Sequence, residues 1–159
     1  MHLATYVGLL DHAERSLADA FRLVATNDAV DPDVAHTCET LASASDRHVE
    51  RLAPVVRRYG ERDGVEPKAM GLKTTRPGGP GLLRDLLDVY ALASFVDLTW
   101  TVVANVARGL RDSALLDVAE SCEQETDRQL AWLRTRVKHS APRVLIPAEP
   151  RSERPGAPR

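Results

Sequence analysis

Apolar residues recur at intervals of three, four and seven over four long segments of this chain, and this spacing constrains the fold more than any other feature. The segments cover approximately residues 3–25, 32–59, 82–108 and 113–141. Such intervals place side chains on one face of an α-helix, whereas a half-buried strand would alternate apolar and polar residues. No segment shows that alternation. The sequence therefore predicts an all-α fold built from four amphipathic helices.

Local signals set the ends of these helices. Asp31, which is followed by a proline, has the residue type preferred at an N-cap, and the proline suits the first helical position. Gly60 and Gly109 are expected to end the second and third helices, because glycine is common just past a helix C-terminus. Asp112 or Ser113 is expected to cap the fourth helix.

The lengths of the links predict how the helices are arranged. Only a few residues separate the first helix from the second and the third from the fourth, so each pair must be antiparallel. The link at residues 60–81 can span a whole bundle, since about twenty extended residues reach beyond ~60 Å and a helix of ~25 residues is ~38 Å long. We expect two antiparallel hairpins joined by a long crossover, with the bundle at residues 1–140 and a flexible Pro- and Arg-rich tail at 141–159.

Composition and charge narrow the range of functions. A formal net charge of -2 and a pI of about 6.2 give no basic field for nucleic acid. The N-terminus has no basic segment followed by an apolar run, and no stretch holds the ~20 apolar residues that span a bilayer. Cys38 and Cys122 form no zinc or disulfide pattern and are expected to be reduced packing residues. A cytoplasmic protein without nucleic-acid or membrane partners is expected.

Each of the four apolar stripes carries polar residues near its middle. Because mid-helix positions meet at one height whichever way the helices point, these residues should form one layer inside the bundle. Burying ionisable groups without partners costs several kcal/mol apiece, so they must share protons, pair with one another or hold a metal ion. The residues are Glu14, Ser45, His48, Asp97, Thr101, Glu123 and Thr126.

This arrangement resembles the ferritin-like superfamily, the group of ferritin, bacterioferritin and rubrerythrin. Those bundles have a long crossover between helices two and three and a di-iron centre formed by Glu, Glu-x-x-His, Glu and Glu-x-x-His on successive helices. Glu14 matches the first glutamate. His48 matches the histidine of the first Glu-x-x-His motif, whose glutamate is replaced here by Ser45.

The second half of the motif departs further from the family pattern. Asp97 matches the third-helix glutamate one methylene short, and Glu123 matches the glutamate of the second Glu-x-x-His motif, whose histidine is replaced by Thr126. The resemblance thus implies a degenerate di-iron site without ferroxidase activity. It leaves a carboxylate and histidine set that suits a single Fe, Mn or Zn ion.

Two classes of function follow. In the first, a protonated His48 pairs with Glu14 or Glu123, no cofactor is needed, and the bundle is a small-ligand or protein-interaction module that tolerates Glu14→Gln or His48→Leu. In the second, the chain is a single-metal oxidoreductase using oxygen or peroxide, in which Glu14, His48 and Glu123 bind the ion and Asp97 is a fourth ligand or proton acceptor. The resemblance also implies a homodimer.

Other polar and aromatic residues are assigned structural roles. Four acidic side chains near the layer are expected at the solvated surface, and two tryptophans at stripe edges are expected to be core or interface residues. Three cations near the end of the fourth helix fit the negative end of its dipole better than a binding patch. The acidic residues are Asp46, Glu120, Glu125 and Asp127. The tryptophans are Trp100 and Trp132, and the cations are Arg134, Arg136 and Lys138.

Overall fold

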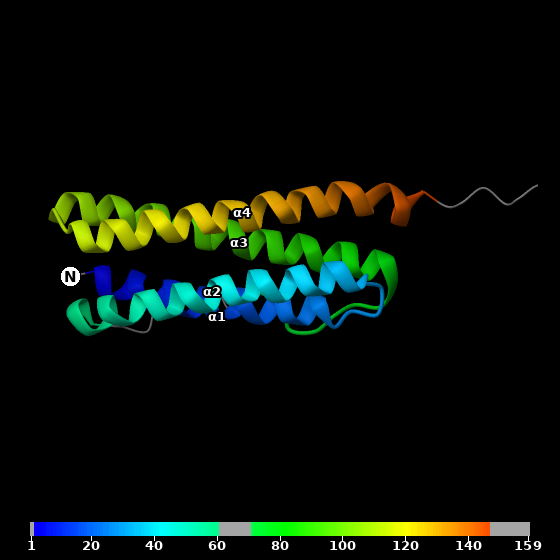
Figure 1. Cartoon of the computed structure of the whole chain (residues 1–159), viewed down its shortest axis with the longest axis horizontal. Coiled ribbons are helices and arrows are strands. Elements are labelled where there is room, and N and C mark those ends of the chain that lie inside the picture. Colours follow the sequence, from blue (N-terminus) through cyan, green and yellow to red (C-terminus); the bar gives the residue numbers. More distant parts are fainter. Residues whose placement is uncertain (1, 61–70, 147–159) are drawn as a thin grey trace, which may run out of the picture.

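The computed structural model describes residues 2–60 and 71–146 and contains four α-helices that lie side by side along one long axis (Figure 1). No strand occurs in the described residues, so the predicted all-α, four-helix fold is confirmed. The helices are α1 (Leu3–Ala25), α2 (Pro32–Tyr59), α3 (Gly78–Leu110) and α4 (Ser113–Leu145).

Most helix ends lie where the sequence signals place them. Asp31 has extended backbone angles at the N-cap of α2, and Gly60 follows this helix with a φ of 79°, a conformation that favours glycine. The side chain of Asp112 caps α4 by accepting a hydrogen bond from the backbone N–H of Leu115 at 3.0 Å.

Two helices are longer than predicted. α3 begins at Gly78 rather than near residue 82, because the proline at position 80 lies in the first turn, where its missing N–H has no intrahelical acceptor to lose. α4 continues through Pro142 to Leu145, so the first residues of the predicted tail at 141–159 are helical instead. Val144 packs close to Gly79, and this contact with α3 supports the last turn of α4. Residues 147–159 of the predicted tail and residues 61–70 of the predicted crossover lie outside the described residues.

Contacts at the two ends of the bundle define the direction of each helix. Asn27, just after α1, donates a hydrogen bond to the carbonyl of Arg76 at 2.9 Å, so the start of α3 lies at the α1–α2 turn. At the other end, the hydroxyl of Tyr59 donates to Asp112 in the α3–α4 turn. α2 and α3 therefore run in the same direction, and the chain between them joins opposite ends of the bundle (Figure 1).

Packing is closest within the two hairpins, α1 with α2 and α3 with α4. α1 also packs against α3, whereas α2 and α4 touch less extensively. Large side chains that are completely buried, such as Phe21, Leu86 and Trp100, fill the core. Burying a side chain of this size contributes about 1.5–3 kcal/mol, and this burial is what holds the helices together.

α3 is apolar on more than its buried face. Its 18-residue window of highest hydropathy averages 1.5, and by length and composition this helix could cross a membrane, a test that a core helix of a bundle also passes. Less than half of that window, 44%, is buried inside the structure. Several of the remaining apolar side chains of α3, among them Leu87, Leu98 and Val106, are exposed.

Candidate functional site

The centre of the bundle holds a buried hydrogen-bonded trio from three helices. Glu14 on α1, His48 on α2 and Trp100 on α3 are each 0% exposed. Oε1 of Glu14 lies 2.8 Å from Nδ1 of His48 and accepts a hydrogen bond from the indole N–H of Trp100 at 2.7 Å. The imidazole and indole rings also meet edge to face, with centroids 6.0 Å apart. The structure thus brings two of the predicted site residues together and adds Trp100, which has a polar role that its position at a stripe edge did not suggest.

The opposite edge of the imidazole faces Glu125 on α4. Nε2 of His48 lies 3.4 Å from this carboxylate, which also pairs with Arg51 at 3.1 Å and Arg47 at 3.4 Å. Burial alone would raise the pKa of Glu125, but His48 and the two arginines outweigh it and lower this pKa below its ordinary value. The prediction of a solvated surface position for Glu125 was wrong, because only 20% of its side chain is exposed and it completes the environment of His48.

Asp97 and Glu123 form a second, more exposed group on α3 and α4. The hydroxyl of Thr101 donates a hydrogen bond to Glu123 at 2.5 Å. Asp97 is half-buried; its pKa is raised, first by burial and then by the negative charges of Asp127 and Glu123. In the described part of the chain, no hydrogen bond or ion pair joins this group to Glu14 or His48. The predicted single layer is therefore divided into two.

Ser45 and Thr126, which replace the glutamate and histidine of the two Glu-x-x-His motifs, each form a hydrogen bond with an uncharged group. Ser45 accepts a hydrogen bond at 3.1 Å from the side-chain amide of Gln129, which also donates to the carbonyl of Leu41 at 3.0 Å. The hydroxyl of Thr126 donates to the carbonyl of Cys122 in its own helix at 2.9 Å. Gln129 is 1% exposed and was not anticipated from the sequence. The two bonds of Gln129 join α4 to α2, whereas the bond of Thr126 stays within α4.

Glu14, His48 and Glu125 cannot all bind the same metal ion. The two nitrogens of an imidazole point away from each other, so Glu14 at Nδ1 and Glu125 at Nε2 cannot converge with His48 on one ion. Across residues 2–60 and 71–146, no three His, Cys, Asp or Glu side chains gather as a metal-binding group. The di-iron centre implied by the family resemblance would in addition need a carboxylate at Ser45 and an imidazole at Thr126.

Both cysteines are buried and free. Burial raises the pKa of each thiol to about 12, so neither is a thiolate at neutral pH. Cys38 and Cys122 are therefore unreactive packing residues, in agreement with the sequence prediction.

Asp97→Asn should stabilise the fold at neutral pH. Oδ1 of Asp97 is buried without a hydrogen-bond partner, and the pKa of this carboxyl is raised in the folded state. A raised folded-state pKa stabilises the fold at low pH, and this stabilisation is lost as the pH rises through the folded-state pKa. At pH 7, asparagine carries no charge and should therefore raise the free energy of unfolding. The gain should be less than about 1 kcal/mol, since the side chain is partly solvated. Well below pH 3.8, the ordinary value, wild type and variant should differ least. Urea unfolding followed by circular dichroism at both pH values measures the difference, and a loss of stability at pH 7 would contradict the assignment.

Comparison of the chain with protein-family models, with curated proteins and with solved structures finds no match, so the site has to be interpreted from its own residues.

Proposed function

We propose that the chain is a ferritin-like four-helix bundle without ferroxidase activity that works as a protein-interaction module, pairing with a second copy of itself through the outer face of α3. Two antiparallel hairpins with α2 and α3 running in the same direction support the ferritin-like assignment. The observation that carries the interaction role is the apolar stripe on the outside of α3.

This stripe, called here the α3 outer stripe, repeats every three to four residues along most of the helix. Its members are exposed or half-buried, and Leu98 at the centre is 64% exposed. An exposed apolar row of this length, without a charged residue in its central part, is a feature of interfaces rather than of free surfaces. The residues are Leu87, Ala91, Phe95, Leu98, Val102, Val106 and Leu110.

The stripe is self-complementary when a second copy lies antiparallel. A two-fold axis between Leu98 and the residue after it brings Leu87 beside the partner's Leu110, and brings the two Leu98 side chains together across the axis. A closed two-fold contact of this kind uses the same patch on both subunits. When two packed helices supercoil around each other, residues that repeat at intervals of three and four stay along the contact between them.

Charge favours the antiparallel arrangement over the parallel one. Asp88 lies at the start of the stripe, and Arg108 and Arg111 lie at its end. Asp88 already pairs with Arg76 at 2.9 Å and with Arg84 at 3.4 Å in its own chain, so this end is not an acidic patch. Antiparallel pairing keeps the terminal arginines of one copy away from those of the other, and it opposes the two helix dipoles favourably. Parallel pairing would bring like charges together.

The interior supports an interaction role over an enzymatic one. Glu14, His48 and Trp100 are completely buried, so a substrate could reach them only if the bundle opened. Their hydrogen bonds to one another leave no nucleophile or general base facing a cavity. A buried polar network of this kind fits a role in fixing the register of the helices.

Leu98→Glu should convert the dimer to a monomer. Each dimer would then hold two carboxylates beside its axis, and we expect the dissociation constant to rise at least about a hundredfold, that is by about 2.7 kcal/mol. Sedimentation equilibrium on the full chain measures this constant. Tyr6→Glu is the matched control, because Tyr6 is a similarly exposed apolar residue, 43%, on another helix. A wild type that stays monomeric at high micromolar concentration, or equal effects of both substitutions, would contradict the proposal.

The orientation of the copies can be tested separately by crosslinking. Chains carrying Leu87→Cys, mixed with chains carrying Leu110→Cys, should form a disulfide between copies, and Leu87→Cys alone should not. Crosslinking of Leu87→Cys with itself would show a parallel pair and overturn the antiparallel arrangement while leaving the α3 outer stripe as the interface.

A further inference from the structure

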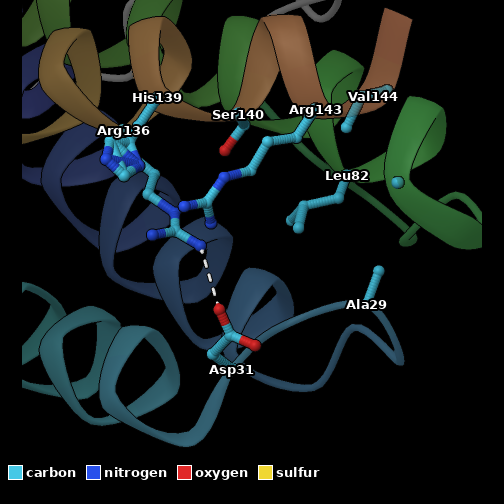
Figure 2. Close-up of a pocket in the computed structure, with 9 residues that line it drawn as sticks. Ala29, Asp31, Leu82, Arg136, His139, Ser140, Arg143 and Val144 are labelled. Atoms are coloured by element: carbon cyan, nitrogen blue, oxygen red, sulfur yellow. Dashed lines mark hydrogen bonds and ion pairs between the residues drawn. The ribbon is translucent and has the colours of Figure 1, made fainter. Parts of the chain in front are cut away.

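A second candidate binding site lies at the end of the bundle, away from the α3 outer stripe. A pocket of about 140 Å³ is enclosed by the α1–α2 turn, the start of α3 and the last turns of α4 (Figure 2). This volume holds a few water molecules or one small ion. Three of its lining residues are the basic side chains Arg136, His139 and Arg143, whereas Asp31 is the one lining carboxylate.

Hydrogen-bond donors without partners surround the pocket. Ser140 is only 8% exposed, yet within the described ranges its hydroxyl has no hydrogen bond, and Figure 2 shows it turned toward the guanidinium groups. Nε of Arg136 is buried and has no acceptor. Arg143 reaches into the same pocket and has no ion pair with any described carboxylate. A buried donor such as Nε of Arg136 is costly without an acceptor, so a ligand with several oxygens that reaches it and the two neighbouring donors would stabilise this end of the bundle.

The helix starts around the pocket add positive potential. Asp31 is the N-cap residue of α2 and makes no side-chain cap hydrogen bond, and Gly79 lies in the first turn of α3, where, among the described residues, only the N–H of Gly78 donates to a side chain, that of Asp28 at 3.3 Å. The N-terminal ends of helices carry partial positive charge and free backbone N–H groups. A β-carbon at Gly79 would lie 3.1 Å from Val144, so the small residue lets the α3 backbone approach α4 closely.

The dipole of α4 explains only part of this cluster. Cations at the C-terminal end of a helix are favourable, as the sequence predicted for Arg134, Arg136 and Lys138. These residues have different surroundings in the structure. Arg134 lies outside the pocket and donates a hydrogen bond to the hydroxyl of Tyr90, whereas Arg136 lies 3.4 Å from the carboxylate of Asp31. A dipole effect does not require a serine hydroxyl without a hydrogen bond that is turned toward two guanidinium groups, or a buried Nε without an acceptor.

We propose that this pocket binds one small oxyanion of the phosphate class, held by Arg136, Arg143 and Ser140. Guanidinium groups match phosphate oxygens with paired N–H donors. Donors that converge from several sides suit a tetrahedral anion better than a planar carboxylate, which offers fewer oxygens. Asp31, whose side chain is 66% exposed, lies against Arg136 in the structure and would compete with the anion for this guanidinium.

Calorimetric titration of the full chain with inorganic phosphate, at low ionic strength in a phosphate-free buffer, tests the proposal. We expect saturable binding of one phosphate per chain, with acetate at least about tenfold weaker. Arg143→Gln should weaken phosphate binding at least about tenfold, and Ser140→Ala should weaken it less, because Ser140 contributes a neutral donor. Asp31→Asn should strengthen binding, since it removes the competing carboxylate.

Arg134→Gln provides the matched control, as it removes the same charge from α4 outside the pocket. It should leave binding within about twofold of wild type, and circular dichroism should show every variant folded. Absence of saturable binding to wild type, or equal losses in Arg143→Gln and Arg134→Gln, would overturn the proposal. Methyl phosphate distinguishes two sources of the group: binding as tight as that of inorganic phosphate supports a phosphate ester as ligand, and weaker binding supports the free ion.

Discussion

Replacing His48 by leucine should lower the free energy of unfolding by about 3–5 kcal/mol, because Glu14 would be left as a buried charge without its partner. Oε1 of Glu14 would keep only the indole N–H of Trp100, and Oε2 already has no hydrogen-bond partner. Glu14→Leu should cost a similar amount, since it removes the acceptor of both the imidazole and the indole. Chemical denaturation followed by helical circular dichroism measures both losses.

The double variant Glu14→Leu/His48→Leu should be more stable than either single variant. It leaves only the N–H of Trp100 without an acceptor, at a cost of about 1–3 kcal/mol, and replaces the pair with apolar side chains. Glu14→Gln is the conservative control: its side-chain carbonyl can still accept from Trp100 and His48, so we expect nearly wild-type stability, as the sequence alone also suggested. The sequence suggested the same tolerance for His48→Leu, and the complete burial of Glu14 argues against it. Additive losses in the double variant would contradict a coupled buried pair.

Gly81→Ala should destabilise the fold on the order of 3 kcal/mol. A β-carbon at this position would lie 2.6 Å from the backbone carbon and oxygen of Arg76, which cannot move without breaking other contacts. The same carbonyl accepts a hydrogen bond from Asn27, and the guanidinium of Arg76 lies 2.6 Å from the fully buried carboxylate of Asp85. The substitution would therefore separate the start of α3 from the α1–α2 turn.

Gly109 provides the control for this prediction. It lies within the same helix, and a β-carbon there would meet nothing within 4 Å. Gly109→Ala should stabilise the fold by about 0.5–1 kcal/mol, because alanine loses less backbone entropy than glycine in a helix. Urea midpoints of the two variants should move in opposite directions. A neutral Gly81→Ala would show that the link before α3 does not fix this end of the bundle.

Periodicity and turn chemistry were enough to predict the helices. The spacing of apolar residues located all four, and the capping residues Asp31, Gly60 and Asp112 located most of their ends. The end of α4 depends on a tertiary contact: its last turn continues past Pro142 because Val144 packs against the start of α3. Such a contact cannot be recognised from local sequence.

The rotation of the helices about their axes was harder to predict, and this error rearranged the candidate site. α4 carries polar residues on both sides of its buried face, so a stripe through Glu123 and one through Cys122 fit the spacing almost equally well. The structure buries Cys122, which turns Glu125 toward His48 and Glu123 toward α3.

α3 presents the opposite difficulty. Because it is apolar on nearly every side, no polar face in its sequence fixes its rotation. The structure turns Trp100 into the centre and leaves Asp97 half-buried. The hydrogen bond from Trp100 to Glu14 had no sequence signal apart from the need of a buried indole N–H for an acceptor.

Metal content is the most direct test of whether the bundle interior is a hydrogen-bonded network rather than a catalytic centre. Elemental analysis of protein purified without affinity metal, followed by anaerobic titration with Fe(II), Mn(II) and Zn(II), should find far less than one tightly bound ion per chain. Glu14→Gln should behave in the same way as wild type. Binding of one ion per chain that is lost in the folded Glu14→Gln variant would contradict the network and make Glu14 and His48 ligands of a metal site.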